Sequence, residues 1–151
     1  PNVAIITAQT NGYSAELERT FFMGDVPDEA KKVFDVTMEA RAKAFELIKP
    51  GVRAEDLDRE VLSIIEDAGF GKHILHRTGH GFGITGHEPP WVALGSEHVL
   101  AKNMVISIEP GIYIESVGGF RHSDTVLVTD NGCVSLTEYP DSLDELTLKL
   151  P

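Results

Sequence analysis

The first apolar run of the chain predicts a β-hairpin. Residues 3–7 (VAIIT) are apolar and β-branched, which is typical of a buried strand. An Asn-Gly turn follows at residues 11–12, and residues 13–22 have the pattern of a second strand. Alternation along this strand puts Glu16 and Glu18 on the same face. The two glutamates therefore mark either a solvated edge or a pair of carboxylates in a site.

Two helices are predicted next. Residues 25–28 (DVPD) have the marks of a helix start, and apolar residues then recur every three or four positions until Lys49-Pro50-Gly51 ends the helix. The expected inward stripe consists of Phe34, Met38, Arg41, Phe45 and Ile48. A second helix is expected over residues 54–68, before Gly69. Two helices joined by a short turn form a layer that needs a sheet to cover.

The last part of the chain alternates strands and turns. Strands are expected over residues 104–108, 112–115, 120–128 and 133–136. Along residues 120–128, alternation separates Arg121, Ser123 and Thr125 from His122, Asp124 and Val126. The tail, residues 137–151, is acidic and then apolar at Leu146, Leu148 and Leu150. We expect this tail to seal the sheet or an oligomer contact.

Composition and charge exclude some classes of partner. The 151 residues are 42% hydrophobic and 25% charged, as in ordinary globular proteins, and the formal net charge is −11. Such an acidic surface repels phosphate backbones and acidic membranes, so neither nucleic acid nor a membrane is expected as a partner. No apolar run approaches the roughly 20 residues of a membrane span. The single cysteine, Cys133, cannot form an internal disulfide, which favours a cytoplasmic location.

A cluster of histidines and glycines marks a candidate active site. Residues 76–83 (HRTGHGFG) contain two histidines and three glycines, and residues 87–90 (HEPP) follow closely. Glycine lets the backbone approach a ligand, and imidazole suits proton transfer or metal binding near neutral pH. A single loop histidine is most often structural, but His80 and His87 in this setting favour a site.

Glu109 is a second candidate. An apolar strand ends there against Pro110-Gly111, so the carboxylate is expected to be partly buried. A buried, unpaired carboxylate costs several kcal/mol and therefore needs a cationic, protonated or metal partner. His80, Arg121 or a bound ligand are the candidate partners. The alternative is a structural glutamate that caps nearby backbone amides.

Three sequence blocks resemble the pita-bread superfamily, which includes Xaa-Pro dipeptidase (prolidase), aminopeptidase P, methionine aminopeptidase and creatinase. The blocks are residues 76–90, 108–113 (IEPGIY) and 119–132, in that order. The resemblance covers essentially the whole chain and implies an α+β fold in which helices cover a curved antiparallel sheet. Members carry more catalytic domain before the position of Pro1. Residues 1–151 are therefore expected to form a single unit, the C-terminal part of a pita-bread catalytic domain whose upstream part is absent from this chain.

In the peptidases, the resemblance implies two metal ions held by two Asp, one His and two Glu. His80 and Glu109 match the histidine and the first glutamate, and Glu16 stands where the bridging aspartate is expected. Ile5 and Ser123 stand at the other two acid positions and are poor ligands for a divalent metal. Because two-metal sites need carboxylates that bridge cations about 3.5–4 Å apart, a second metal is not expected.

Creatinases, which share the fold and lack metal, offer another precedent. Residues 17–20 (LERT) resemble their hairpin strand, in which the glutamate binds the substrate guanidinium. This resemblance implies the same role for Glu18, with Glu109 as the second guanidinium-binding carboxylate. His76, in contrast, resembles the residue that prolidases have at this position. The catalytic histidine of creatinase lies upstream of the segment present.

The predicted function is a hydrolase that cleaves an amide-like C–N bond in a small or dipeptide-like substrate, without a metal cofactor. The expected catalytic residues are His80 (orientation or proton shuttle), His87 (oxyanion), Glu109 (water activation or cation binding) and Arg121 (support of the carboxylates). The expected substrate-binding residues are Glu16, Glu18, His76 and Ser123. One alternative is an Xaa-Pro peptidase with one metal on Glu16, His80 and Glu109, and another is a non-catalytic binding module. A homodimer is expected.

Overall fold

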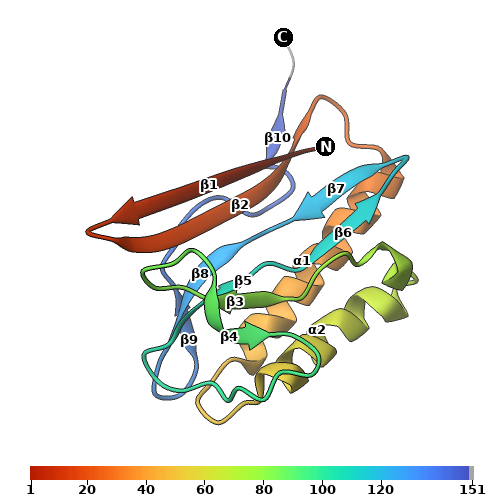
Figure 1. The fold of residues 1–151 in the computed structure, drawn as a ribbon. Coiled ribbons are helices and arrows are strands. Elements are labelled where there is room, and N and C mark those ends of the chain that lie inside the picture. The colour runs from red at the N-terminus through yellow and green to blue at the C-terminus, as the bar shows by residue number, and fades with distance from the viewer. Residues whose placement is uncertain (150–151) are drawn as a thin grey trace.

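The architecture combines a long hairpin, a pair of helices and a set of short strands, seen in a computed structural model that describes residues 1–149 (Figure 1). The strands are β1 Asn2–Thr10, β2 Tyr13–Met23, β3 Gly79–Gly81, β4 Glu88–Val92, β5 Val105–Ile108, β6 Gly111–Ile114, β7 Gly118–Arg121, β8 Asp124–Val128, β9 Cys133–Ser135 and β10 Thr147–Leu148. The helices are α1 Asp28–Leu47, α2 Ala54–Asp67 and a short 3-10 helix at Gly71–His73.

The β1–β2 hairpin forms as the sequence predicts. The two strands pair antiparallel along their whole length, and Asn11 and Gly12 turn with φ of 52° and 86°. The expectation that residues 3–7 are buried is wrong, because Ile5 and Ile6 are 55% and 56% exposed. In the described part of the chain, β1 is the outer strand of its sheet, with β2 as its hydrogen-bonded neighbour.

Both helices are confirmed, with a change at the first one. α1 begins at Asp28, a few residues later than expected, because Pro27 is extended (φ −63°, ψ 146°) and serves as the N-cap. The inward stripe of α1 is also shifted from the predicted one: Phe34 and Ile48 are buried, but Met38 and Phe45 are only half-buried. Small residues, including the fully buried Ala40 and Ala44, bring α1 close to the rest of the core instead.

The remaining strands form a second, antiparallel sheet and a ribbon. The five-stranded sheet has the order β4-β3-β5-β8-β9, and β6 pairs with β7. The strand predicted over residues 120–128 is broken, since β7 ends at Arg121 and β8 begins at Asp124. The break lies where Ser123 bridges to Glu18 on β2, so the chain leaves its β6 partner and joins β5.

Helices and strands share one core. Buried side chains from α1, α2, β5, β6, β7 and β8 belong to one apolar cluster, and Figure 1 shows the two helices side by side on the same side of the strands. The helices in the described part of the chain are too short or too polar to cross a membrane.

The tail seals the sheet, which is one of its two expected roles. β10 pairs parallel with β2, and Leu146 is buried while Leu148 stays half-exposed. Leu150 lies outside the described residues. The organisation of residues 1–151 as one part of a larger catalytic domain stays a prediction.

Candidate functional site

Three ligand-type side chains converge from three strands. Glu16 comes from β2, His80 from β3, and Glu109 directly follows β5. His80 Nε2 lies 3.4 Å from Glu109 Oε1 and 3.9 Å from Glu16 Oε1. Candidate ligand atoms of all three residues lie within 4.8 Å of one another, and all three residues are buried. The sequence named these residues, and the tertiary structure brings them together.

The hydrogen bonds of His80 fix its tautomer. Nδ1 lies 3.0 Å from the carbonyl oxygen of Gly81, which can only accept, so Nδ1 carries the hydrogen. Nε2 is then a lone-pair acceptor, and this buried atom has no hydrogen-bond partner among residues 1–149. A lone pair facing two carboxylates is unfavourable unless a proton or a cation lies between them.

The shifted pKa values of Glu109 and His80 also favour a proton or a cation between these groups. Burial raises the pKa of Glu109 to about 8, and the nearby charge of Glu16 adds to the rise. Burial also lowers the pKa of His80, so the imidazole is neutral near pH 7. Without a cation, the pocket therefore disfavours both an ionised Glu109 and a charged imidazole. One imidazole nitrogen with two carboxylates is a donor set that suits a divalent metal ion.

Arg121 lies beside two acids, Glu18 and Glu109. Its Nη2 donates a hydrogen bond to Glu18 Oε1, and its Nη1 lies 3.9 Å from Glu109 Oε2. Burial raises the pKa of Glu18, which Arg121 partly offsets. Glu109 thus has two of the candidate partners expected for it, His80 and Arg121. Glu18 is directed to Arg121, and its other oxygen is buried without a hydrogen-bond partner in the described part of the chain.

The two other predicted histidines, His76 and His87, have different surroundings. The exposed ring of His87 stacks on His80, with ring centroids 4.0 Å apart and an angle of 32° between the planes. His76 is half-buried: Nδ1 donates to the carbonyl oxygen of Arg77 at 2.8 Å, and Nε2 accepts from the Tyr113 hydroxyl at 2.7 Å. Of the two, His87 has a ring in contact with the Glu16–His80–Glu109 cluster.

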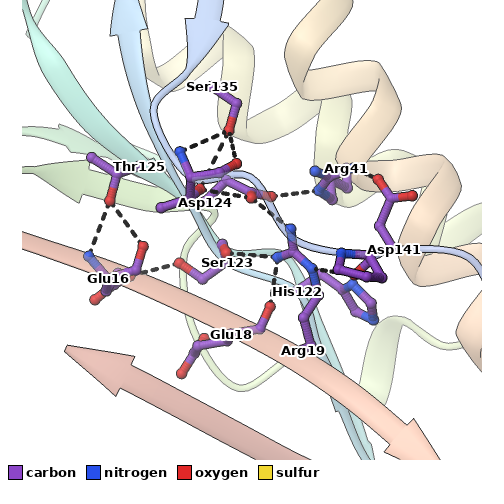
Figure 2. A network of polar contacts seen from close by, with 12 residues as sticks. Glu16, Glu18, Arg19, Arg41, His122, Ser123, Asp124, Thr125, Ser135 and Asp141 are labelled. Atoms are coloured by element: carbon purple, nitrogen blue, oxygen red, sulfur yellow. Dashed lines mark hydrogen bonds and ion pairs between the residues drawn. The ribbon is translucent and has the colours of Figure 1, made fainter. Parts of the chain in front are cut away.

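Ile5 and Ser123, the two residues that stand where the resemblance implies acids, have different surroundings in the structure. The Ser123 hydroxyl donates to Glu16 Oε1 at 2.7 Å, so it supports a ligand-type side chain (Figure 2). Ile5 pairs across the hairpin with Glu18 and presents an apolar side chain on that face. The region that a second metal ion would occupy is therefore bordered by a hydroxyl and an alkyl group.

Sequence reasoning missed several residues that shape the site. Trp91 is the cross-strand partner of His80, and the half-buried guanidinium of Arg77 stacks on its ring at 4.9 Å. Buried Asp58 accepts hydrogen bonds from the backbone of Thr78 and Leu94, each at 2.8 Å. A signal for Asp58 was available, because it occupies an inward position of the α2 stripe. The pairing of β3 with β4, which creates the Trp91 contact, has no such signal.

The comparisons with known proteins identify the family. A model of metallopeptidase family M24 matches residues 3–130. The chain belongs to metallopeptidase family M24. An M24 relative from Bacillus subtilis, described as a putative dipeptidase, is 41% identical over 88% of this chain, and the Xaa-Pro dipeptidase of Pyrococcus furiosus is 41% identical over 85%.

Solved structures agree with the M24 assignment and with the predicted pita-bread fold. The prolidase of Pyrococcus horikoshii superposes with a TM-score of 0.91 at 40% identity and covers 93% of this chain. The chain spans 37% of the length of the two curated relatives and 41% of that crystal structure's chain. The predicted α+β pita-bread fold, present in part, is confirmed.

Proposed function

We propose that the protein is an M24 hydrolase that cleaves a peptide C–N bond in a dipeptide-sized substrate and holds a single divalent cation on Glu16, His80 and Glu109. The observation that carries the proposal is the buried Nε2 lone pair of His80, which faces two carboxylate oxygens and has no hydrogen-bond donor among the residues that the structure describes. A cation in this position satisfies all three groups at once. Ile5 and Ser123 leave too few ligands for a second one.

The bound cation would polarise the scissile carbonyl and lower the pKa of water. Glu109 would be ionised beside the cation and would accept a proton from the attacking water. Arg121 holds Glu109 and Glu18 in place through its two terminal nitrogens. His87, exposed and stacked on His80, is placed to donate a hydrogen bond to the developing oxyanion.

Arg77 and Trp91, which lie beside His80, suit the C-terminal end of a dipeptide. The relatives described as dipeptidases support a substrate with a free C-terminal carboxylate. Arg77 donates to the carbonyl oxygen of Gly79 and stacks on Trp91, but it makes no ion pair with an acid in the described part of the chain. We infer that its free guanidinium nitrogens bind the substrate carboxylate, with Trp91 as an apolar surface beneath.

Catalysis without metal, as predicted from the sequence, is the second candidate. One observation favours it: with a pKa of about 8, Glu109 carries a proton near pH 7 and can donate it to His80 Nε2. A proton then replaces the cation between the two groups. In this reading, Glu18 and Glu109 bind a cationic substrate group, as the creatinase resemblance implies.

Metal analysis separates the candidates. Full-length protein purified without chelator is expected to hold about one divalent ion per chain, and hydrolysis of Xaa-Pro dipeptides should stop on chelation and return with added metal. Hydrolysis that survives chelation would favour the metal-free route. A protein that binds dipeptides but cleaves neither these nor amidino compounds would favour the third alternative, a non-catalytic binding module. A homodimer and a cytoplasmic location stay predictions.

A further inference from the structure

We propose that Arg19 is a positioning residue that sets the affinity of the candidate cation site. Arg19 does not contact the ligand atoms of Glu16, His80 or Glu109, yet it holds the backbone joint on which Glu16 depends. The inference rests on the proposed function, because it treats Glu16 as a cation ligand.

The joint connects the β1–β2 hairpin to the break between β7 and β8. The Glu18 amide donates to the Ser123 carbonyl oxygen at 3.1 Å, and the Ser123 amide donates to the Glu18 carbonyl oxygen at 3.2 Å. Arg19 Nη1 donates to the same two carbonyl oxygens, at 2.7 Å to Glu18 and 3.0 Å to Ser123. One guanidinium nitrogen therefore fastens both sides of the joint (Figure 2).

Buried contacts hold the Arg19 guanidinium itself. Nη2 donates to Asp124 Oδ1 at 2.9 Å, and Nε donates to the carbonyl oxygen of Pro140 at 3.1 Å. The Asp124 side chain is fully buried and also accepts from Arg41 Nε at 2.6 Å and from the Thr137 hydroxyl at 2.9 Å. All three nitrogens of the guanidinium are thus engaged, which leaves Arg19 little freedom to move.

The joint reaches the candidate metal site through Ser123. Its hydroxyl donates to Glu16 Oε1 at 2.7 Å, and this oxygen is the one that lies 3.9 Å from His80 Nε2. The Thr125 hydroxyl, on β8, holds the backbone of Glu16: it accepts from the Glu16 amide at 3.0 Å and donates to the Glu16 carbonyl oxygen at 2.9 Å. Because a cation tolerates ligand displacements of only about 0.5 Å, a looser joint would weaken binding.

Arg41 supplies a matched control. It also binds the buried carboxylate of Asp124, and it reaches Asp141 at 3.2 Å, but it does not contact the carbonyl oxygens of Glu18 or Ser123. If the Arg19–Asp124–Arg41 cluster only stabilised the fold, conservative changes at either arginine would lower stability and nothing else. A positioning role makes the two arginines differ at the site.

The test compares Arg19→Lys with Arg41→Lys in the full-length protein. Each variant keeps its charge and loses the planar fork. We expect Arg19→Lys to speed amide hydrogen exchange at Glu18 and Ser123, and to weaken Mn²⁺ binding, measured by EPR of free Mn²⁺, by about ten- to a hundredfold. Arg41→Lys should lower the melting temperature and leave amide exchange at the joint and the Kd for Mn²⁺ unchanged.

A double-mutant cycle checks the route through Ser123. Ser123→Ala removes the hydroxyl that binds Glu16, so the loss of Mn²⁺ affinity in Arg19→Lys/Ser123→Ala should be smaller than the product of the two single losses. Independent effects, in which the losses multiply, would overturn the proposed route.

Two further results would overturn the proposal: unchanged Mn²⁺ affinity in Arg19→Lys, or an equal loss in Arg41→Lys. If the parent protein binds no Mn²⁺, the cation site of the proposed function is wrong. The positioning role of Arg19 is then tested in the metal-free protein. In that case the ¹⁵N resonance of His80 Nε2, which senses the Glu16 carboxylate, should move in Arg19→Lys and stay in place in Arg41→Lys. No movement would reject the positioning role.

Discussion

At the scale of single residues, the chemistry of the site depends on what lies between His80 Nε2 and Glu109. Burial, assisted by Glu16, raises the pKa of Glu109 to about 8, so the acid is protonated near neutral pH unless a cation displaces the proton. The imidazole does not compete for that proton, because burial lowers the pKa of His80. In the proposed site, a cation would therefore replace the proton on Glu109.

This exchange predicts the pH dependence of cation binding. Below pH 8 the cation must displace the proton of Glu109, so affinity should rise about tenfold per pH unit and level off above pH 8. Calorimetric titration in buffers of different ionisation enthalpy should show about one proton released near pH 6. Glu109→Gln should bind more weakly and lose the slope. A slope that persists in Glu109→Gln would assign the proton to another group.

In the proposed function, Ile5 and Ser123 limit the site to one ion. Because the resemblance places both at acid positions of the two-metal peptidases, Ile5→Asp combined with Ser123→Glu should raise the metal content from about one to about two ions per chain. Elemental analysis after dialysis against Zn²⁺ or Mn²⁺ measures the change, and the two single variants are the controls. A folded double variant that still holds one ion would contradict this account of the missing site.

The proposed role of Arg77 is to bind the substrate carboxylate. Arg77→Ala should raise the KM of an Xaa-Pro dipeptide by about ten- to a hundredfold, since a charge-assisted hydrogen bond contributes roughly 1.5–3 kcal/mol. The KM of the matching dipeptide amide, which has no carboxylate, should change little. Equal effects on both substrates would place the carboxylate elsewhere.

At the scale of elements, α2 organises the strand that carries His80. Asp58 lies on the buried face of α2 and is 1% exposed. Both of its oxygens accept backbone hydrogen bonds, one from Thr78 before β3 and one from Leu94 after β4. The α2 helix thus fixes both ends of the β3–β4 pair, on which His80 and Trp91 lie opposite each other.

Removing this link should destabilise the fold. Asp58→Ala leaves two backbone amides without acceptors, at roughly 2–5 kcal/mol in total. Asp58→Asn keeps one acceptor oxygen and should lose about half as much. Urea unfolding followed by the fluorescence of Trp91 measures both changes. Equal losses in the two variants would mean that the charge of Asp58, rather than its two acceptors, stabilises the fold.

At the scale of the whole molecule, stability should depend on a histidine that the proposed chemistry does not use. His122 is fully buried, packs edge-on against Phe34 at 5.1 Å and accepts a hydrogen bond from the Thr20 amide at 3.4 Å. Burial lowers its pKa to about 3, and the charges of Arg19 and Arg41 add to the fall. The folded protein therefore resists protonation of this ring.

The sign of the pH effect follows from this depressed pKa. Between roughly pH 6.5 and pH 3 the unfolded chain binds a proton at His122 that the folded chain does not, so the free energy of unfolding falls as pH falls, by about 1.4 kcal/mol per pH unit. Denaturant titrations at a series of pH values should show this slope, and His122→Asn should reduce it. An equal slope in both proteins would assign the acid sensitivity to other groups.

The sequence by itself determined the local elements and the chemical inventory. The Asn11-Gly12 turn, the α2 stripe and the β5 strand each depend on neighbours in the chain, so their periodicity and turn chemistry sufficed. The histidine and acids of the site could be named because their residue types and motif spacing are visible in the sequence. Their convergence followed from the resemblance, since no local pattern brings β2, β3 and β5 together.

Only the tertiary structure decided the features that depend on packing between distant segments. The exposure of Ile5, the break at His122–Ser123 and the pairing of His80 with Trp91 arise where strands choose their neighbours. The role of Arg19 was hidden for the same reason. Its guanidinium joins carbonyl oxygens and a carboxylate from segments about a hundred residues apart, and sequence periodicity describes one strand at a time.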